Sequence, residues 1–234
     1  MHPGAPAHPL DNPAWSSLTG PHAALAEGRA TARRYRSGMS PFAAIASEHD
    51  IEAWAELRTL VTPGETVILF GSQLLAPAPP AGWDVEVEGL AIQMVATDAL
   101  RDETDPEVTV LGAPDTDDMV DLAERTQPGP FTRGTRLLGT YLGFRREGQL
   151  IAMAGERLHP EGWTEISAIC TDPAARGQGL ASRLTRAVAH GIRERGETPL
   201  LHVAATNENA IRLYRAIGFS PRRDFTYTFL RRHV

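Results

Sequence analysis

The sequence has little of what several protein classes require. Its 234 residues hold one cysteine, Cys170, which excludes an internal disulfide framework, and the eight histidines lack the paired spacing of zinc sites. No apolar run approaches membrane-spanning length, and the first residues lack the basic start and apolar stretch of a secretory signal. A formal charge of -6 gives no general attraction to nucleic acid or anionic lipid. We therefore expect a soluble, unprocessed cytoplasmic protein without metal, nucleic-acid or membrane partners.

The first part of the chain predicts a small α/β region over residues 1–102. Residues 1–28 are rich in Pro, Gly, Ala and His without a steady period, which predicts an irregular arm held by Trp15 and Leu18. After this arm we expect a helix that Asp50 caps and Thr62-Pro63-Gly64 ends, a strand over 65–71, a proline-rich connector over 73–83 and a strand over 83–98.

The second part, residues 103–234, has a more regular pattern. It predicts strands over 107–112, 140–158 (two strands joined by a turn at 146–148), 163–171, 198–205 and 224–232, and helices after Pro114, over 179–195 and over 207–218. Strands that alternate with helices indicate a mixed sheet covered by helices.

A glycine-rich step joins a strand to a helix at "TDPAARGQGLASRL", residues 171–184. Gly177 and Gly179 leave backbone N–H groups unshielded where the helix begins, and the helix dipole makes that end positive. Such a step can cradle a phosphate, with Arg176 adding charge-assisted hydrogen bonds. The alternative is a tight turn that needs glycine only for its backbone angles.

Two separated motifs together carry a family resemblance. Arg176, Gly179 and Ala181 form Arg-x-x-Gly-x-Ala at the start of a helix, and downstream come Asn207, Leu213-Tyr214 and Gly218-Phe219. This combination resembles the GNAT superfamily of N-acetyltransferases over a little more than half of the chain, and the glycine-acyltransferase-like branch fits as well. The resemblance implies the GNAT acyl-CoA N-acyltransferase fold, α/β with a mixed central sheet flanked by helices. The N-terminal α/β half would be a degenerate copy of that fold or an unrelated cap.

The resemblance also implies a co-substrate, acetyl-CoA, and the residues that hold it. The pyrophosphate would bind the loop and first helical turn made of Arg176, Gly177, Gln178, Gly179, Leu180, Ala181 and Ser182. The pantetheine arm would pair with Ile169, Cys170 and Thr171 as an added strand, and Asn207 would contact the cofactor. The implied reaction transfers acetyl to a primary amine of a small molecule, amino acid or peptide by direct attack in a ternary complex. The alternative is a non-catalytic acyl-CoA sensor or scaffold.

Acyl transfer to an amine needs a proton for the departing thiolate and a base for the amine. The family places a tyrosine at the position of Tyr214 near the sulfur, and a phenol stays protonated at neutral pH, although Tyr214 also fits a core-packing role. Glu165 is a candidate base, because burial would raise its pKa, and alternation predicts that it faces the same side as Ser167 and Ile169. A solvated or paired carboxylate is the alternative. His202 and an ordered water are the other candidates for the base.

Three rival interpretations fit less well. Gly177-x-Gly179-x-x-Ser182 lacks the third glycine of a dinucleotide-binding loop, and no Gly-Lys-Ser/Thr follows as in a Walker loop. Cys170 has no histidine placed by the sequence to activate it, so we expect no acyl-cysteine intermediate. The acceptor, the acyl length and the oligomeric state stay open, with a homodimer among the alternatives.

Overall fold

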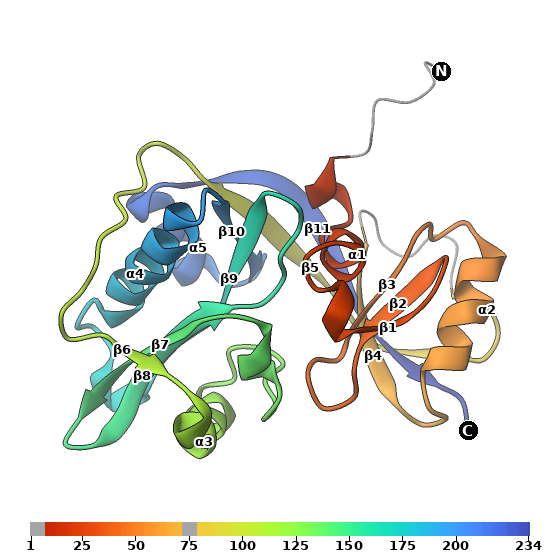
Figure 1. Ribbon diagram of the computed structural model, residues 1–234, viewed down its shortest axis with the longest axis horizontal. Helices are drawn as coiled ribbons and strands as arrows, with labels where there is room; N and C mark the ends of the chain where they lie inside the picture. Colours follow the sequence, from red (N-terminus) through yellow and green to blue (C-terminus); the bar gives the residue numbers. More distant parts are fainter. Residues whose placement is uncertain (1–7, 72–78) are drawn as a thin grey trace.

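The computed structural model describes residues 8–71 and 79–234, which form one mixed sheet with helices on its faces (Figure 1). The strand order is β1-β2-β3-β4-β11-β5-β10-β9-β8-β7-β6. The strands are β1 (Ala26–Gly28), β2 (Ala32–Tyr35), β3 (Phe42–Ile45), β4 (Thr66–Gly71), β5 (Trp83–Ala96), β6 (Thr109–Leu111), β7 (Tyr141–Arg146), β8 (Gln149–Glu156), β9 (Trp163–Thr171), β10 (Thr198–Ala204) and β11 (Phe219–Arg232). The helices are α1 (Pro13–Thr19), α2 (Ile51–Leu60), α3 (Thr116–Thr126), α4 (Leu180–Glu194) and α5 (Glu208–Ile217), and a short 3-10 turn, η1 (Pro9–Asp11), precedes α1.

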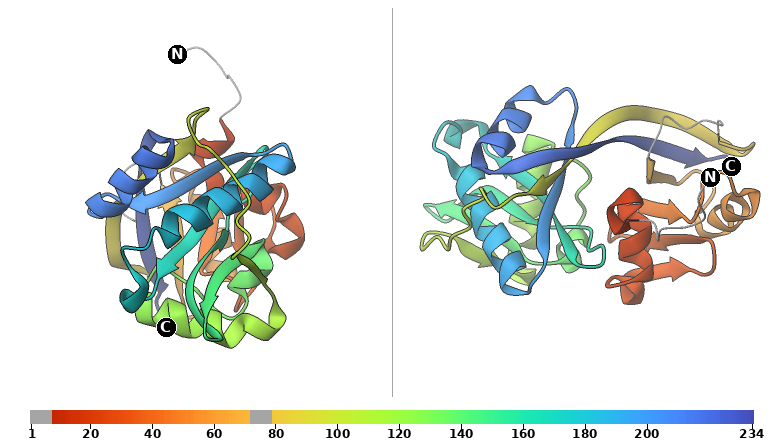
Figure 2. Two further views of the ribbon diagram at one scale, coloured as in Figure 1. Left: turned by 90° about the vertical axis from the view of Figure 1, so that its left-hand side faces the viewer. Right: turned by 90° about the horizontal axis from the view of Figure 1, so that it is seen from above.

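Two long strands connect the N-terminal and C-terminal parts of the sheet. β5 pairs with both β10 and β11, and β11 also pairs with β4, so the sheet continues from β1 to β6. The right-hand view of Figure 2 shows β5 and β11, yellow and blue, running between the two parts. The predicted boundary between residues 102 and 103 lies in the segment that joins β5 to β6. That boundary, and the idea that the first half is a degenerate copy, stay predictions.

The sequence-predicted helices pack as expected. Leu184, Val188 and Ile192 of α4 are buried against the sheet, and α5 contributes Tyr214 and Ile217 to the same apolar cluster. Gly218 ends α5 with a φ of 111°, where an added Cβ would collide with the backbone of Leu100. This contact ties the end of α5 to the segment after β5.

The irregular arm expected for residues 1–28 is wrong for residues 13–19, which form helix α1. The Asn12 side chain accepts a hydrogen bond from the Trp15 amide, and Pro13 occupies the first turn, where its missing N–H has no consequence. Leu18 is fully buried, and Trp15 packs against the same cluster, as the sequence suggested. The sequence did not predict strands β1 to β3. Most of the predicted proline-rich connector, residues 73–78, lies outside the described residues.

Candidate active site

The site begins where two parallel strands separate. β9 and β10 pair only at their first residues, from Trp163 opposite Thr198 to Glu165 opposite Leu200. Beyond that point β9 continues for six residues, 166–171, without a partner strand on its β10 side. The Asp172 amide donates to Ile151 of β8, so alternation turns the backbone groups of Ile169 and Thr171 toward the open side. This edge can accept an extended ligand as an added strand.

A β-bulge in β9 fixes the faces of its side chains. Ala168 has a φ of 51°, and the pairing with β8 gains one extra β9 residue between Ser167 and Cys170. Ile166 and Ile169 therefore contact the α4 side of the sheet, whereas Ala168 and Cys170 contact the α3 side. The prediction that Glu165 shares a face with Ile169 is wrong, because the bulge interrupts the alternation between them.

The glycine-rich loop lies directly after this strand and starts α4. Gly177 and Gly179 adopt φ values of 78° and 74°, which explains the need for glycine, and a Cβ at either would meet open space. Gly179 is the N-cap and has no side chain, so the N–H groups of the first turn receive no side-chain cap. Arg176 and Gln178 are exposed beside it. The loop therefore presents free donors and a positive helix end to solvent, which suits an anion.

Asn207 and Tyr214 lie on the helix after β10. The Asn207 side chain accepts a hydrogen bond from the Ala210 amide and so caps α5. Tyr214 is 8% exposed, packs edge-on against Phe219, and makes no hydrogen bond through its hydroxyl within the described residues. Burial raises the pKa of Tyr214 to about 12, so its phenol is protonated at neutral pH. Tyr214 shares its apolar cluster with Ile169 on the α4 side of the open edge.

Glu165 is fully buried and fully engaged. Arg157 donates to both of its oxygens, from Nε at 2.9 Å and from Nη2 at 2.6 Å, and Nδ1 of His202 lies 2.7 Å from Oε1. Burial acts to raise the pKa of Glu165, but the charge of Arg157 and its hydrogen bonds, with those of His202, outweigh it and lower that pKa below its ordinary value. The expected rise in pKa is therefore wrong, and the paired-carboxylate alternative describes the geometry.

The proton on His202 can be assigned from its neighbours. Arg222 donates to Oε1 of Gln93, which fixes the orientation of that amide. Nε2 of Gln93 then donates to the Leu10 carbonyl at 3.1 Å and to Nε2 of His202 at 3.1 Å. Nε2 of His202 must accept, so Nδ1 carries the proton and donates to Glu165. Both ring nitrogens are occupied, and the ring stacks on Phe70 with centroids 4.8 Å apart.

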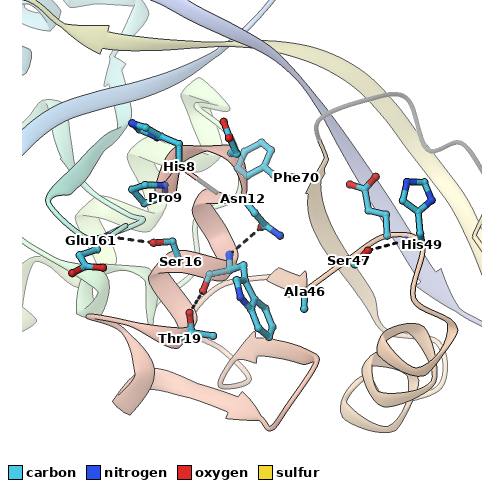
Figure 3. A pocket seen from close by; sticks show the side chains of 13 residues that line it. His8, Pro9, Asn12, Ser16, Thr19, Ala46, Ser47, His49, Phe70 and Glu161 are labelled. Carbon is cyan, nitrogen blue, oxygen red and sulfur yellow. Dashed lines mark hydrogen bonds between the residues drawn. The ribbon is translucent and has the colours of Figure 1, made fainter. Parts of the chain in front are cut away.

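A cavity of about 480 Å³ opens on the N-terminal side of this network. Residues of η1, α1 and the loop after β3 line it, and Phe70 forms one wall (Figure 3). The Phe70 ring also stacks on His202 of β10, so this wall of the cavity contacts the network around Glu165. Glu48, half-buried in the lining, pairs with no cation among the described residues, and burial raises the pKa of its carboxyl.

The Cys170 thiol also lies near the site. Burial raises the pKa of the Cys170 thiol to about 11, so it is not poised as a nucleophile.

Within residues 8–71 and 79–234, no helix combines the length and apolar character of a membrane span. The same part of the chain contains no cluster of three or more His, Cys, Asp or Glu side chains arranged to hold a metal ion.

Gln93 and Tyr141 belong to this region but were not singled out from the sequence. Gln93 is a polar residue in an apolar stretch of β5, which was an available signal for a buried hydrogen-bonding role. Tyr141 is 1% exposed, and its only local mark is the aromatic start of a strand. The hydrogen-bond partners of Gln93 come from segments far away in the chain, so no local pattern identifies them.

Comparisons with known proteins match this geometry. The family model described as "FR47-like protein" matches residues 141–229. A solved structure from Novosphingobium aromaticivorans, assigned to the GNAT family of acetyltransferases, shares 40% identity and a TM-score of 0.89, covering 97% of this chain and all of that one. A GCN5-related N-acetyltransferase from Kribbella flavida, 17% identical with a TM-score of 0.64, shares the fold.

Two acetyltransferases are also similar in sequence, each over only part of its own length. A mycothiol acetyltransferase of Nocardia farcinica is 32% identical over 209 residues, which cover 85% of this chain and 64% of that protein. A second mycothiol acetyltransferase, from Thermomonospora curvata, is 37% identical over 76 residues, 26% of its length. The chain thus spans less than two thirds of either relative.

Proposed function

Because the chain belongs to the GNAT family of acetyltransferases, we propose that it transfers an acetyl group from acetyl-CoA to a primary amine by direct attack in a ternary complex. The observation that carries this proposal is the uncapped N-terminus of α4 beside the open edge of β9. The first feature suits a diphosphate and the second suits an extended amide-containing arm. Their adjacency matches a ligand that contains both, as coenzyme A does.

The residues present fit acetyl-CoA. Open space surrounds the Cα atoms of Gly177 and Gly179, and the Thr171 hydroxyl is buried without a hydrogen-bond partner among the described residues. We assign residues 176–182 to the diphosphate, Ile169, Cys170 and Thr171 to the pantetheine arm, and Asn207 to a further contact through its side-chain NH2, since its oxygen caps α5. Acetyl-CoA would supply the thioester, and the chain's part is to hold and orient it.

Tyr214 is the residue we propose as the proton donor to the thiolate. Its phenol is protonated, because burial alone raises its pKa to about 12, with no hydrogen bond from a described residue to its hydroxyl. The carboxylate of Glu165 is already saturated by Arg157 and His202, and both nitrogens of His202 are occupied. The geometry therefore favours deprotonation of the amine through water over direct transfer to either residue.

We propose that the amine acceptor binds in the cavity that Phe70 lines. Its lining mixes aromatic rings with the half-buried carboxylate of Glu48, a combination that suits an amine-bearing small molecule. The relatives named mycothiol acetyltransferase support a small-molecule acceptor. Glu48→Gln should raise KM for the amine several-fold and leave KM for acetyl-CoA unchanged.

Two measurements test the proposal. Calorimetry with coenzyme A should show binding that weakens at least tenfold in Gly177→Val/Gly179→Val, since β-branched residues oppose positive φ. Thiol release from acetyl-CoA should rise above background with an amine from a panel of small molecules, amino acids and peptides. Binding without release would favour the acyl-CoA sensor, and absence of binding would refute both functions.

A further inference from the structure

The cavity beside α1 holds more negative charge than its own surroundings neutralise. Three acidic residues line it, Asp11, Glu48 and Glu161. Arg222 and Arg223 pair with Asp11, at 2.7 and 3.1 Å. The chain contains no lysine, and the described lining residues include no arginine. Glu161 is exposed to solvent, so Glu48 is the half-buried carboxylate that lacks a cation within the described part of the chain.

The loop after β3 fixes the position of Glu48 through its backbone. Nε1 of Trp54 in α2 donates to the Glu48 carbonyl at 2.9 Å, and the Ser47 hydroxyl accepts from the His49 amide at 3.3 Å. These bonds leave the Glu48 carboxylate without a hydrogen bond from any described residue. Burial raises the pKa of this carboxyl, and the charge of His49 acts in the opposite direction. A cationic ligand would supply the charge that the carboxylate lacks.

A carboxylate in the acceptor cavity has a consequence for which nitrogen reacts. An aliphatic ammonium has a pKa of about 10 and a carboxyl group one of about 4, so the proton stays on the nitrogen when the two pair. A nitrogen that keeps its proton has no lone pair with which to attack a thioester. The nitrogen held by Glu48 is therefore not the nitrogen that receives the acetyl group.

The cavity extends from Glu48 toward the strand that carries the open edge. Figure 3 shows Ser47 and His49, which flank Glu48, on the opposite side of the cavity from Glu161. Glu161 lies in the loop before β9, and β9 separates from β10 after Glu165. A ligand held at Glu48 can thus point its other end toward the start of the open edge.

We propose that the acceptor has two basic nitrogens joined by an apolar spacer, one held as an ammonium by Glu48 and the other free to attack the thioester. This inference rests on the proposed function. The attacking nitrogen forms the C–N bond as the C–S bond breaks, its proton leaves to water, and the thiolate takes a proton from Tyr214. The charge held at Glu48 also lowers the pKa of the second nitrogen, since like charges repel, and so favours its neutral form. Trp15 and Phe70 offer aromatic surface to the spacer.

Matched acceptors test this proposal. Hexamethylenediamine and hexylamine differ by one amino group, as do lysinamide and norleucinamide. In thiol release from acetyl-CoA, the wild type should prefer the dibasic member of at least one pair by about fivefold or more in kcat/KM, and the preference should shrink in about 0.5 M salt. Glu48→Gln should raise KM for the dibasic member about fivefold, leave the monobasic member nearly unchanged and keep the melting temperature. The control is Glu52→Gln, exposed in the first turn of α2 outside the cavity, which should keep the preference.

The outcomes separate this inference from the function beneath it. Absence of thiol release with every amine overturns the proposed transfer and this inference with it. Thiol release without preference for either dibasic member, or a preference that Glu48→Gln leaves intact, overturns only the dibasic acceptor. An equal fall in kcat for both members in Glu48→Gln, with loss of the acidic limb of the pH–rate profile, would identify Glu48 as the general base and overturn its ion pair with the acceptor.

Discussion

Replacing Glu165 by Gln tests whether this carboxylate stabilises the folded protein through its ion pair or acts as the general base. The side chain of Glu165 is fully buried, and that of Arg157 is 10% exposed. Glu165→Gln would leave the Arg157 guanidinium buried without a counter-ion, which costs about 3–5 kcal/mol. At about 2–4 °C per kcal/mol for a chain of this size, the melting temperature should fall by about 6–20 °C.

The assay is thermal and urea unfolding of Glu165→Gln, Arg157→Met and the double variant. Because the two groups contact each other, the double variant should be less destabilised than the sum of the single ones. Glu208→Gln is the matched control, since Glu208 pairs with Arg212 on the exposed face of α5 and its loss should change stability by less than about 0.5 kcal/mol.

The pH dependence has a definite sign. The pKa of Glu165 is lower in the folded protein than in the unfolded chain, so its stabilisation is complete above the ordinary carboxyl pKa and is lost as pH falls below it. If Glu165→Gln kept the wild-type melting temperature but lost kcat more than 100-fold and lost the acidic limb of the pH–rate profile, Glu165 would be the base, and its structural role would be wrong.

Three further predictions concern single sites. Burial, with the charge of His159, lowers the pKa of His22 to about 3. The free energy of unfolding should therefore fall by about 2 kcal/mol between pH 7.5 and pH 5, because the unfolded chain takes up a proton that the folded protein does not. Urea midpoints should fall less in His22→Gln than in the exposed control His49→Gln. Gly179→Ala should cost about 1–2 kcal/mol in urea unfolding through its positive φ and weaken coenzyme A binding measured by calorimetry. Gly218→Ala adds a collision with Leu100 to the same strain, so its melting temperature should fall further than that of Gly179→Ala.

How much the sequence predicts depends on how local the cause is. Helix α4 follows from an apolar stripe and a glycine-rich start within one segment, and the loop that we assign to the cofactor was recognisable for the same reason. Strand β2 reads Ala-Arg-Arg-Tyr and was not predicted, because the buried Arg34 is satisfied by distant groups, the Glu65 carboxylate 31 residues away and the Leu60 carbonyl. The sequence cannot show that partner.

The same limit applies to the residues predicted for the site. Glu165 was singled out as a candidate base and is buried, but the direction of its pKa shift depends on Arg157 and His202, which come from a loop and from another strand. Burial alone raises a carboxyl pKa, and only the folded contacts reverse that sign. The break in alternation at Ala168 was equally hidden, because alanine carries no preference for a bulge.

The backbone at Ala168 offers a last test of how the open edge is made. A non-glycine residue in the left-handed region costs about 1–2 kcal/mol, and such strain persists where the surroundings impose it. Ala168→Gly removes the strain but also a methyl that is 8% exposed, worth about 0.8 kcal/mol, so stability and coenzyme A affinity should barely change. Ala168→Val should be destabilised by more than about 1 kcal/mol, because a β-branched residue opposes this conformation. If Val at position 168 left the positive-φ region, the alternation of β9 would be restored and its open edge would shift, so calorimetry should show weaker coenzyme A binding to Ala168→Val. Equal affinity in both variants would mean that the bulge does not determine the shape of the edge.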